Sequence, residues 1–401
     1  MGKVVSFNPM MGGKYFNGER LKIARMWRNL SATQLADFTG FSRQTISMLE
    51  NGKLMTPEFA TVQKLSEKLE FPITFFLEET KINFNESTTY FRSLLTTNKK
   101  YRVEQEEKIK FIAIVYNMLS EYLEFEKMNL PQIPMNTTPQ EAANILREHW
   151  GLGNKPIENI VYLAESNGLI VTDFETATGD VDAFSHKITS DDMETYLIGY
   201  SKNKRTAARI HFDVAHEIGH ILLHNWREDL ECIDKEEFKE IELQAHAFAS
   251  AFLLPEEEFR KDVSPYATNL AYYTELKKIW KVSIAAMIRR AKDLDIITAD
   301  DYSRLMRNMQ KQGIRKTEPL DDELVTAEPS LLRQAINILF NQKVFTPNEF
   351  LEELSREYGL TLYPKDIETL LGLKKGTFDE KENPKTVSYT HLRAHETSQD
   401  L

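Results

Sequence analysis

The sequence predicts a multidomain fold in which an all-α bundle is followed by an α+β domain and a small helical C-terminal unit. Apolar residues recur at helical spacing from Glu19 to Leu69, without a strand pattern. Short strands are expected between Leu169 and Gly199, and apolar-faced helices then continue to a last helical unit at Pro329 to Leu371. A chain of 401 residues with 41% hydrophobic content suits two to four such domains.

The composition excludes several classes of protein. Since no apolar stretch reaches membrane-spanning length and no basic segment followed by an apolar run opens the chain, we expect a cytoplasmic protein with no membrane partner. The single cysteine, Cys232, excludes an intramolecular disulfide and a thiolate-cluster zinc site. We interpret Cys232 as a bystander thiol, which leaves histidine and carboxylate as the available metal ligands.

Charge is distributed unevenly along the chain. The net charge of −11 taken alone argues against a nucleic-acid binder. Between Met1 and Lys53, however, there are eight lysine and arginine residues against three acidic ones. This asymmetry predicts a basic, DNA-facing module on an acidic body.

Four helices are expected in the N-terminal module. The first spans Glu19 to Arg28, and Ser31 can cap a short second helix. Gly40 then breaks the chain before a third helix at Arg43 to Leu49, and Pro57 opens a fourth. A helix, a short turn with glycine and a second helix form the unit that places its second helix in a DNA major groove.

The segment RLKIARMWRNLSATQLADFTGFSRQTISMLENGK resembles the Xre/Cro-type repressor family, over about Gly18 to Glu78. The resemblance implies a double-stranded DNA operator as partner, and a homodimer, because such proteins usually read paired half-sites. It implies that Gln34 contacts a phosphate and that the third helix reads bases. The predicted DNA-binding residues are Gln34, Ser42, Arg43, Gln44, Thr45, Ser47, Asn51 and Lys53. A helical bundle with a solvated or protein-docking polar face is the alternative.

The middle of the chain contains a connector, a long helix and the start of a new domain. A polar connector, which contains TTYFRSL, leads into a long charged helix at Arg102 to Met128 with apolar residues along one side, suited to packing or dimerisation. After Pro131 to Pro139 a new domain is expected, with two helices and then small antiparallel strands at Leu169–Thr172, Ala183–His186 and Glu194–Gly199. Such strands offer an edge to an extended peptide substrate.

Two histidines four residues apart mark a metal-binding helix. His216 and His220 fall one turn apart on an apolar-faced helix at Val214 to His224, so both imidazoles can bind one Zn²⁺. Glu217 lies beside them and can act as the general base of a zinc hydrolase. The alternative is a hydrogen-bonded pair of helix histidines without a metal.

A catalytic zinc keeps an open position and needs a third protein ligand. His224 is too far along the same helix, because three imidazoles spaced in this way span about 12 Å. The metzincin position is occupied by Trp226, which excludes that class. A second helix, Phe238 to Leu254, presents Glu242 as the expected third ligand and His246 close behind. The candidates for an accessory donor to the substrate oxyanion are His211, His224, His246 and Tyr196.

The segments FDVAHEIGHILLH and IELQAHAFASAFLLP resemble the two signatures of the ImmA/IrrE family of zinc metallopeptidases. The resemblance implies a zincin-like α+β domain, with His216, His220 and a glutamate of the second signature as ligands and Glu217 as general base. The chain departs from the family at Gln244, where members often carry an acidic residue. If that position supplied the ligand in those proteins, the site in this chain would be weakened; we prefer Glu242, from its place on the second helix.

These resemblances predict a transcriptional regulator with a zinc-dependent endopeptidase, which cleaves a repressor, an antitoxin or itself in a phage, mobile-element or toxin–antitoxin setting. Two alternatives stay open: a repressor whose zinc site is sensory or inactive, and an unrelated metal hydrolase acting on small molecules. The expected parts are a DNA-binding domain (1–80), a connector and long helix (81–130), a metallopeptidase domain (131–316) and a small helical region (317–385).

The last residues, 386–401, are expected to be foreign to the natural protein and disordered. Val387 to Thr397 reads VSYTHLRAHET, which back-translates to a transposon-end adapter used in sequencing libraries. His391, His395 and Glu396 are therefore left out of the search for metal ligands.

Overall fold

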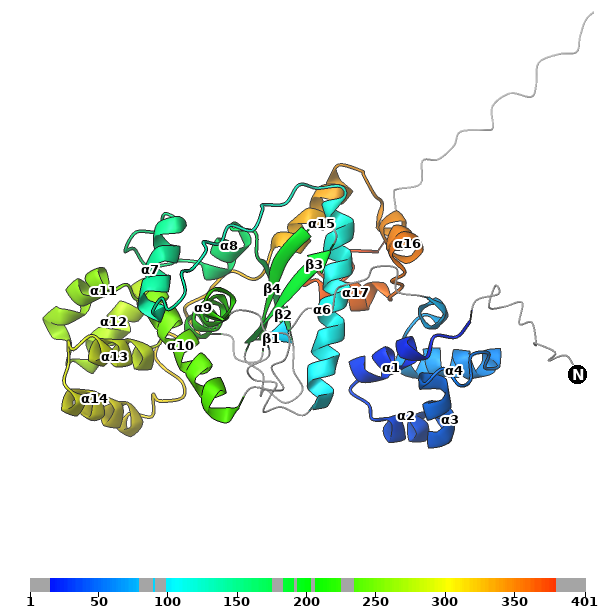
Figure 1. The fold of residues 1–401 in the computed structure, drawn as a ribbon, viewed down its shortest axis with the longest axis horizontal. Helices are drawn as coiled ribbons and strands as arrows, with labels where there is room; N and C mark the ends of the chain where they lie inside the picture. The colour runs from blue at the N-terminus through cyan, green and yellow to red at the C-terminus, as the bar shows by residue number, and fades with distance from the viewer. Residues whose placement is uncertain are drawn as a thin grey trace, which may run out of the picture.

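A computed structural model describes residues 15–78, 89–90, 99–174, 183–190, 193–202, 206–224 and 234–379. Within these ranges a helical N-terminal region is followed by a mixed helix and sheet domain and then by further helices (Figure 1), which confirms the expected fold class. Cys232, Trp226, most of the polar connector and the segment from Val387 to Thr397 lie outside the described residues.

The N-terminal bundle contains α1 (Gly18–Trp27), α2 (Ala32–Thr39), α3 (Arg43–Glu50), α4 (Phe59–Leu69) and the 3₁₀ turn η2 (Ile73–Leu77). A capping box between Ser31 and Gln34 begins α2, and Gly40 ends it at φ 70°, a left-handed conformation that glycine adopts without strain. At Gly18 a Cβ atom would lie 2.1 Å from the carbonyl oxygen of Leu49, so only glycine allows α1 to approach α3 this closely.

The long helix α6 (Lys99–Ser120) differs from its prediction in length and in surroundings. It ends at Ser120 rather than Met128. Ile109, Phe111 to Tyr116, Met118 and Leu119 are buried, on all sides of the helix rather than on one. The reason is that α6 lies between the sheet, the N-terminal bundle and the C-terminal helices (Figure 1), and its apolar residues belong to one core shared with all three.

The sheet has the order β1-β3-β4-β2, with β1 (Thr89–Tyr90), β2 (Ile170–Phe174), β3 (Ala183–Ser190) and β4 (Met193–Ser201). β3 runs antiparallel to β4, as expected, and also to β1, which was not predicted as a strand, but β2 runs parallel to β4. The all-antiparallel prediction was wrong because β3 and β4 pair with each other and β2 is added along the outer side of β4. Tyr90 lies in the TTYFRSL segment, so part of the expected connector pairs with β3.

The two faces of the sheet meet different layers. Alternation along the strands places Phe184 and Leu197 in the core that contains α6, and Ile198 and Tyr200 in the second core. The helices of the second core include α7 (Pro139–His149), α8 (Ile160–Glu165), α9 (Ala207–Leu223) and α10 (Lys235–Leu253). It continues into α11 (Glu256–Val263), α12 (Leu270–Trp280), α13 (Ile284–Asp293) and α14 (Ala299–Lys311), and the turn η5 (Ser264–Tyr266) follows α11 without buried residues of its own.

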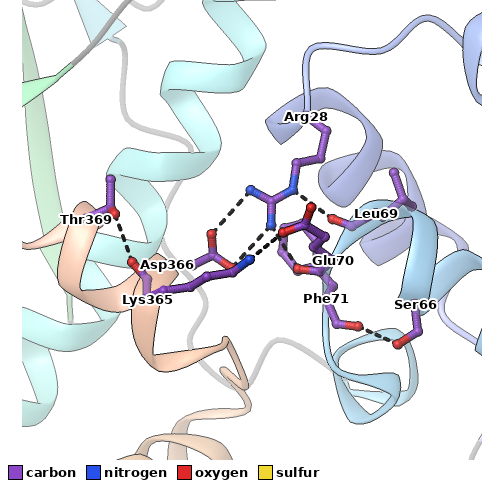
Figure 2. A network of polar contacts seen from close by, with 8 residues as sticks. All are labelled: Arg28, Ser66, Leu69, Glu70, Phe71, Lys365, Asp366 and Thr369. Carbon is purple, nitrogen blue, oxygen red and sulfur yellow. Dashed lines mark hydrogen bonds and ion pairs between the residues drawn. The ribbon is translucent and has the colours of Figure 1, made fainter. Parts of the chain in front are cut away.

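The C-terminal helices contact the N-terminal bundle. They are α15 (Leu331–Asn341), α16 (Pro347–Tyr358) and α17 (Pro364–Leu370), and they share the core of α6. Figure 2 shows Arg28 of the segment after α1 facing Asp366 of α17, with both guanidinium Nη atoms 3.2 Å from the two carboxylate oxygens. Lys365 pairs with Glu70 beside them.

A second set of contacts in this interface is buried. Arg20 is 1% exposed and donates from Nη2 to the carbonyl oxygen of Gly359 at 2.7 Å. Burial lowers the pKa of Arg20, while Glu78 and Glu107 oppose that effect. Glu78 accepts from the backbone N–H of Thr361 at 3.0 Å. We refer to these contacts together with the Arg28–Asp366 and Lys365–Glu70 pairs as the bundle interface.

Across the part of the chain that the structure describes, no helix combines the length and apolar character needed to span a bilayer.

Candidate metal centre

Helix α9 carries the two histidines of the motif toward one point. Thr206 caps the helix through a hydrogen bond to the N–H of Arg209, so α9 begins at Ala207, well before the predicted start. His216 is 3% exposed and His220 is fully buried, and their Nε2 atoms lie 3.0 Å apart. Two imidazole nitrogens at this distance either share one proton or face a common cation.

Helix α10 brings Glu242 to the same point. Its Oε2 lies 3.7 Å from His216 Nε2, and its Oε1 lies 3.4 Å from His220 Nε2. The close approach of α10 depends on Gly219, where a Cβ atom would lie 2.9 Å from the ring of buried Phe248. Among the described residues, His216, His220 and Glu242 form a group of three buried side chains that could hold a metal ion, with their potential donor atoms within 4.8 Å of one another. We call these three residues the ligand group.

The donor set fits Zn²⁺ in chemistry and in size. Zinc binds imidazole nitrogen and carboxylate oxygen at about 2.0–2.2 Å with tetrahedral geometry, which places neighbouring donors about 3.4 Å apart. The two imidazole nitrogens are 3.0 Å apart, and they lie 3.7 Å and 3.4 Å from the Oε2 and Oε1 atoms of Glu242, respectively, which is close to that value. Three protein ligands leave a fourth position for water or substrate, as in catalytic rather than structural zinc sites.

Glu217, the expected general base, is held by a residue that the sequence did not single out. Ser185 of β3 donates from Oγ to Glu217 Oε2 at 2.7 Å, and both residues are buried. Ser185 shares a strand face with Ala183, which lies in the core beneath α9. The contact joins residues 32 apart and depends on how the sheet meets α9, so only the alternation of β3 could have suggested it.

His224 and Gln244 lie on the Nδ1 side of His220, whereas His216 lies on its Nε2 side. His224 Nδ1 is 3.0 Å from His220 Nδ1, and His224 Nε2 is 3.4 Å from Gln244 Oε1. Burial lowers the pKa of His224 to about 4, and the neighbouring His220 adds to the effect. The structure thus places Gln244, the position at which the chain departs from the family pattern, against a histidine that is itself outside the ligand group.

The other accessory candidates have different surroundings. His246 is half-buried, with its ring 4.7 Å from that of His216 and 5.4 Å from that of Phe212. Tyr196 lies in the core beneath α9, where burial raises the pKa of its hydroxyl to about 12. His211 is buried with Nε2 3.3 Å from Thr326 Oγ1, in the segment after α14. His246 thus lies beside His216, one of the residues of the ligand group.

The predicted DNA-binding residues lie on and around α3. Ser42, Arg43, Gln44, Ser47, Asn51, Lys53 and Gln34 are exposed, and Thr45 is half-buried. Ser42 caps α3 by accepting from the N–H of Thr45 at 3.0 Å. Gln34 accepts from the N–H of Ser31 through Oε1, which leaves its NH₂ group as the end that can donate to a phosphate.

Two family models match the chain in the regions just described. Residues 21–76 match the model described as "Helix-turn-helix". Residues 164–292, which include α9 and α10, match the peptidase model described as "IrrE N-terminal-like domain". The chain joins a helix-turn-helix domain to an IrrE-like domain. Both resemblances seen in the sequence are therefore confirmed.

Curated relatives match the helix-turn-helix domain. The HTH-type transcriptional repressor RghR of Bacillus subtilis (strain 168) is 46% identical over 55 residues, which is 14% of this chain and 41% of the relative. The uncharacterized HTH-type transcriptional regulator RghRB of the same strain is also 46% identical over 55 residues, 14% of this chain and 40% of the relative. The chain thus spans about two fifths of the length of these relatives and continues into the IrrE-like domain.

Proposed function

We propose that the protein is a DNA-binding transcriptional regulator whose IrrE-like domain is a zinc-dependent endopeptidase. The observation that carries the proposal is the convergence of His216, His220 and Glu242 beside Glu217 in a chain that also exposes a recognition helix. Since a DNA-binding module accompanies the peptidase, the substrate we propose is a regulatory protein: a repressor, an antitoxin or this chain itself.

In this proposal His216, His220 and Glu242 hold the metal. A bound Zn²⁺ would polarise a peptide carbonyl and lower the pKa of a coordinated water toward about 7. Glu217 takes a proton from the attacking water and passes it to the leaving amine nitrogen. The hydrogen bond from Ser185 engages Oε2 of Glu217 and orients the carboxylate for that transfer. A residue beside the site, such as His246, would donate to the oxyanion.

The small sheet beside α9 is the proposed place for the substrate backbone. An extended peptide can add to the edge of a sheet through main-chain hydrogen bonds. Ser185 of β3 donates to Glu217, so a peptide bound along this sheet would lie close to the proposed general base.

The test compares the zinc-loaded protein with Glu217→Gln. Candidate repressors and antitoxins from neighbouring genes, and the protein itself, are incubated with each form and read by mass spectrometry. Because the amide cannot take a proton, cleavage is expected to fall by about 10²–10⁴-fold, while zinc content and thermal stability stay unchanged. Full cleavage by Glu217→Gln would exclude the proposed mechanism.

The same preparations distinguish a sensory zinc site. In that case no candidate is cleaved by either form, and removal of zinc with a chelator changes operator affinity. We also propose that the protein binds its operator as a homodimer, which light scattering of the protein–DNA complex will show as two chains per site.

A further inference from the structure

A line of polar contacts extends from His220 away from the ligand group. His220 Nδ1 lies 3.0 Å from His224 Nδ1, and His224 Nε2 lies 3.4 Å from Gln244 Oε1. Gln244 Nε2 in turn donates to Glu240 Oε1 at 3.1 Å. His224 reaches this position because it follows the last residue of α9 with extended backbone angles, φ −110° and ψ 107°.

The exposed end of the line sets the direction of every hydrogen bond in it. An ionised carboxylate only accepts, so the amide NH₂ of Gln244 faces Glu240 and its Oε1 faces His224. That oxygen also only accepts, so His224 Nε2 carries the proton. In a neutral, buried ring Nδ1 is then the acceptor, and His220 must donate from its own Nδ1. His220 is left with a lone pair on Nε2.

We propose that His224 and Gln244 are positioning residues that hold His220 in the tautomer and ring orientation required of a metal ligand. The lone pair on Nε2 then faces His216 Nε2, 3.0 Å away, and Glu242. Metal-binding histidines usually donate their other N–H to a carboxylate, a backbone carbonyl or water. Here a second imidazole accepts that hydrogen bond, and an amide anchored on α10 fixes the imidazole.

This inference rests on the metal site of the proposed function but does not depend on proteolysis. It also gives a role to Gln244. A carboxylate at that position could accept a hydrogen bond from His224, but it could not donate one to Glu240, which is also acidic. The amide connects the two groups because it donates on one side and accepts on the other.

The test uses the full chain and two readouts that need no substrate. Zinc affinity is measured by competition with a chromophoric chelator. The His220 tautomer in the metal-free protein is read from long-range ¹H–¹⁵N spectra of protein labelled at histidine. The variants are His224→Phe, which removes the acceptor, His224→Gln, which restores one, and Gln244→Leu. His149→Phe is the matched control, because His149 is exposed on α7 and bonds to Asn129.

Loss of such a partner typically weakens metal affinity about 10–100-fold, and we expect this for His224→Phe. His224→Gln and Gln244→Leu should lie between that variant and the wild type, and His149→Phe should match the wild type. The wild-type spectrum should show the proton of His220 on Nδ1. Unchanged zinc affinity in a folded His224→Phe, or a proton on Nε2 of His220 in the wild type, would overturn the inference. Tight zinc binding without cleavage would instead contradict only the proposed peptidase.

Discussion

At the scale of single residues, the hydrogen bond from Ser185 connects the sheet to Glu217, the proposed general base. A hydrogen bond to a charged group contributes about 1.5–3 kcal/mol. In Ser185→Ala, Glu217 loses the donor at 2.7 Å, so kcat for peptide cleavage should fall about 10–100-fold. Zinc affinity should hold, because Ser185 does not contact the ligands that we propose.

The control for this prediction is Ser185→Thr, which keeps the hydroxyl on the same strand face. Steady-state kinetics on one cleaved substrate, with zinc content measured in parallel, provide the comparison. Equal kcat in Ser185→Ala and the wild type would show that Glu217 needs no orientation by β3.

His211 should make stability depend on pH. Burial lowers its pKa to about 3, with a smaller contribution from Lys281. In the unfolded chain the imidazole binds a proton near its ordinary pKa of about 6.5. The contribution of His211 to the free energy of unfolding is therefore complete above that pH and is lost progressively below it. The free energy of unfolding should fall by about 1.4 kcal/mol per pH unit from this group as pH drops from about 6 toward 4.

Urea unfolding of metal-free wild type and His211→Leu over that pH range measures the difference. The free energy of unfolding should fall less steeply with decreasing pH in His211→Leu, by a slope that corresponds to about one bound proton. This difference in slope does not depend on the absolute stability of the variant. Parallel curves would mean that His211 protonates alike in the folded and unfolded chain.

At the scale of elements, the metal site depends on how closely α9 and α10 pack. In Gly219→Ala the new Cβ would lie 2.9 Å from the ring of Phe248, which is fully buried and cannot move aside. Alanine gains up to about 1 kcal/mol in helix propensity, but overpacking costs about 1–3 kcal/mol. We expect a net loss of stability and weaker zinc binding, because α10 carries Glu242.

Thermal unfolding and chelator competition on Gly219→Ala measure both effects. A variant with wild-type zinc affinity would show that α10 tolerates the displacement without moving Glu242 away from His216 and His220.

The outward face of α3 is the element that we expect to read DNA. Arg43→Ala and Gln44→Ala should each weaken binding to the selected operator by about 1–3 kcal/mol while the fold is kept. Gln63→Ala is the matched control, since Gln63 lies on α4 and bonds to Glu67. Fluorescence anisotropy with an operator recovered by in vitro selection gives the affinities. Equal losses for Gln44 and Gln63 would argue against α3 as the reading helix.

Elements defined by local patterns could be predicted from the sequence. The helices that carry His216 and Glu242 follow from periodicity, and the structure brings these residues together, although their roles as ligands stay predictions. The partner of Glu217 could not be predicted, because it depends on how β3 lies against α9. The surroundings of α6 were also missed, since a helix buried on all sides and one buried on a single side can share the same apolar stripe.

At the scale of the whole molecule, the bundle interface joins residues that are 283 to 339 positions apart in the sequence. Arg28 and Asp366 form a two-bond pair that is partly shielded from solvent, whereas Lys365 and Glu70 are both 59% exposed. Exposed pairs contribute about 0–1 kcal/mol. Asp366→Asn should therefore loosen the interface more than Lys365→Ala, its neighbour in the same helix.

Hydrogen exchange read by mass spectrometry tests this prediction. Faster exchange is expected in both α1 and α17 for Asp366→Asn, and little change for Lys365→Ala. Faster exchange in α17 alone would mean that the contact supports α17 without holding the bundle in place.

The bundle interface also changes what a cut in the chain can achieve. If a protease, or this protein itself, hydrolyses a bond between residues 79 and 98, the covalent link from the bundle to the rest of the molecule is lost. Arg20, Arg28 and Glu78 would still bind residues 359 to 366. A nicked protein would therefore elute as one particle on size exclusion and occupy its operator until the two fragments dissociate. Dissociation of the fragments, rather than hydrolysis, would then set the lifetime of the DNA-bound state.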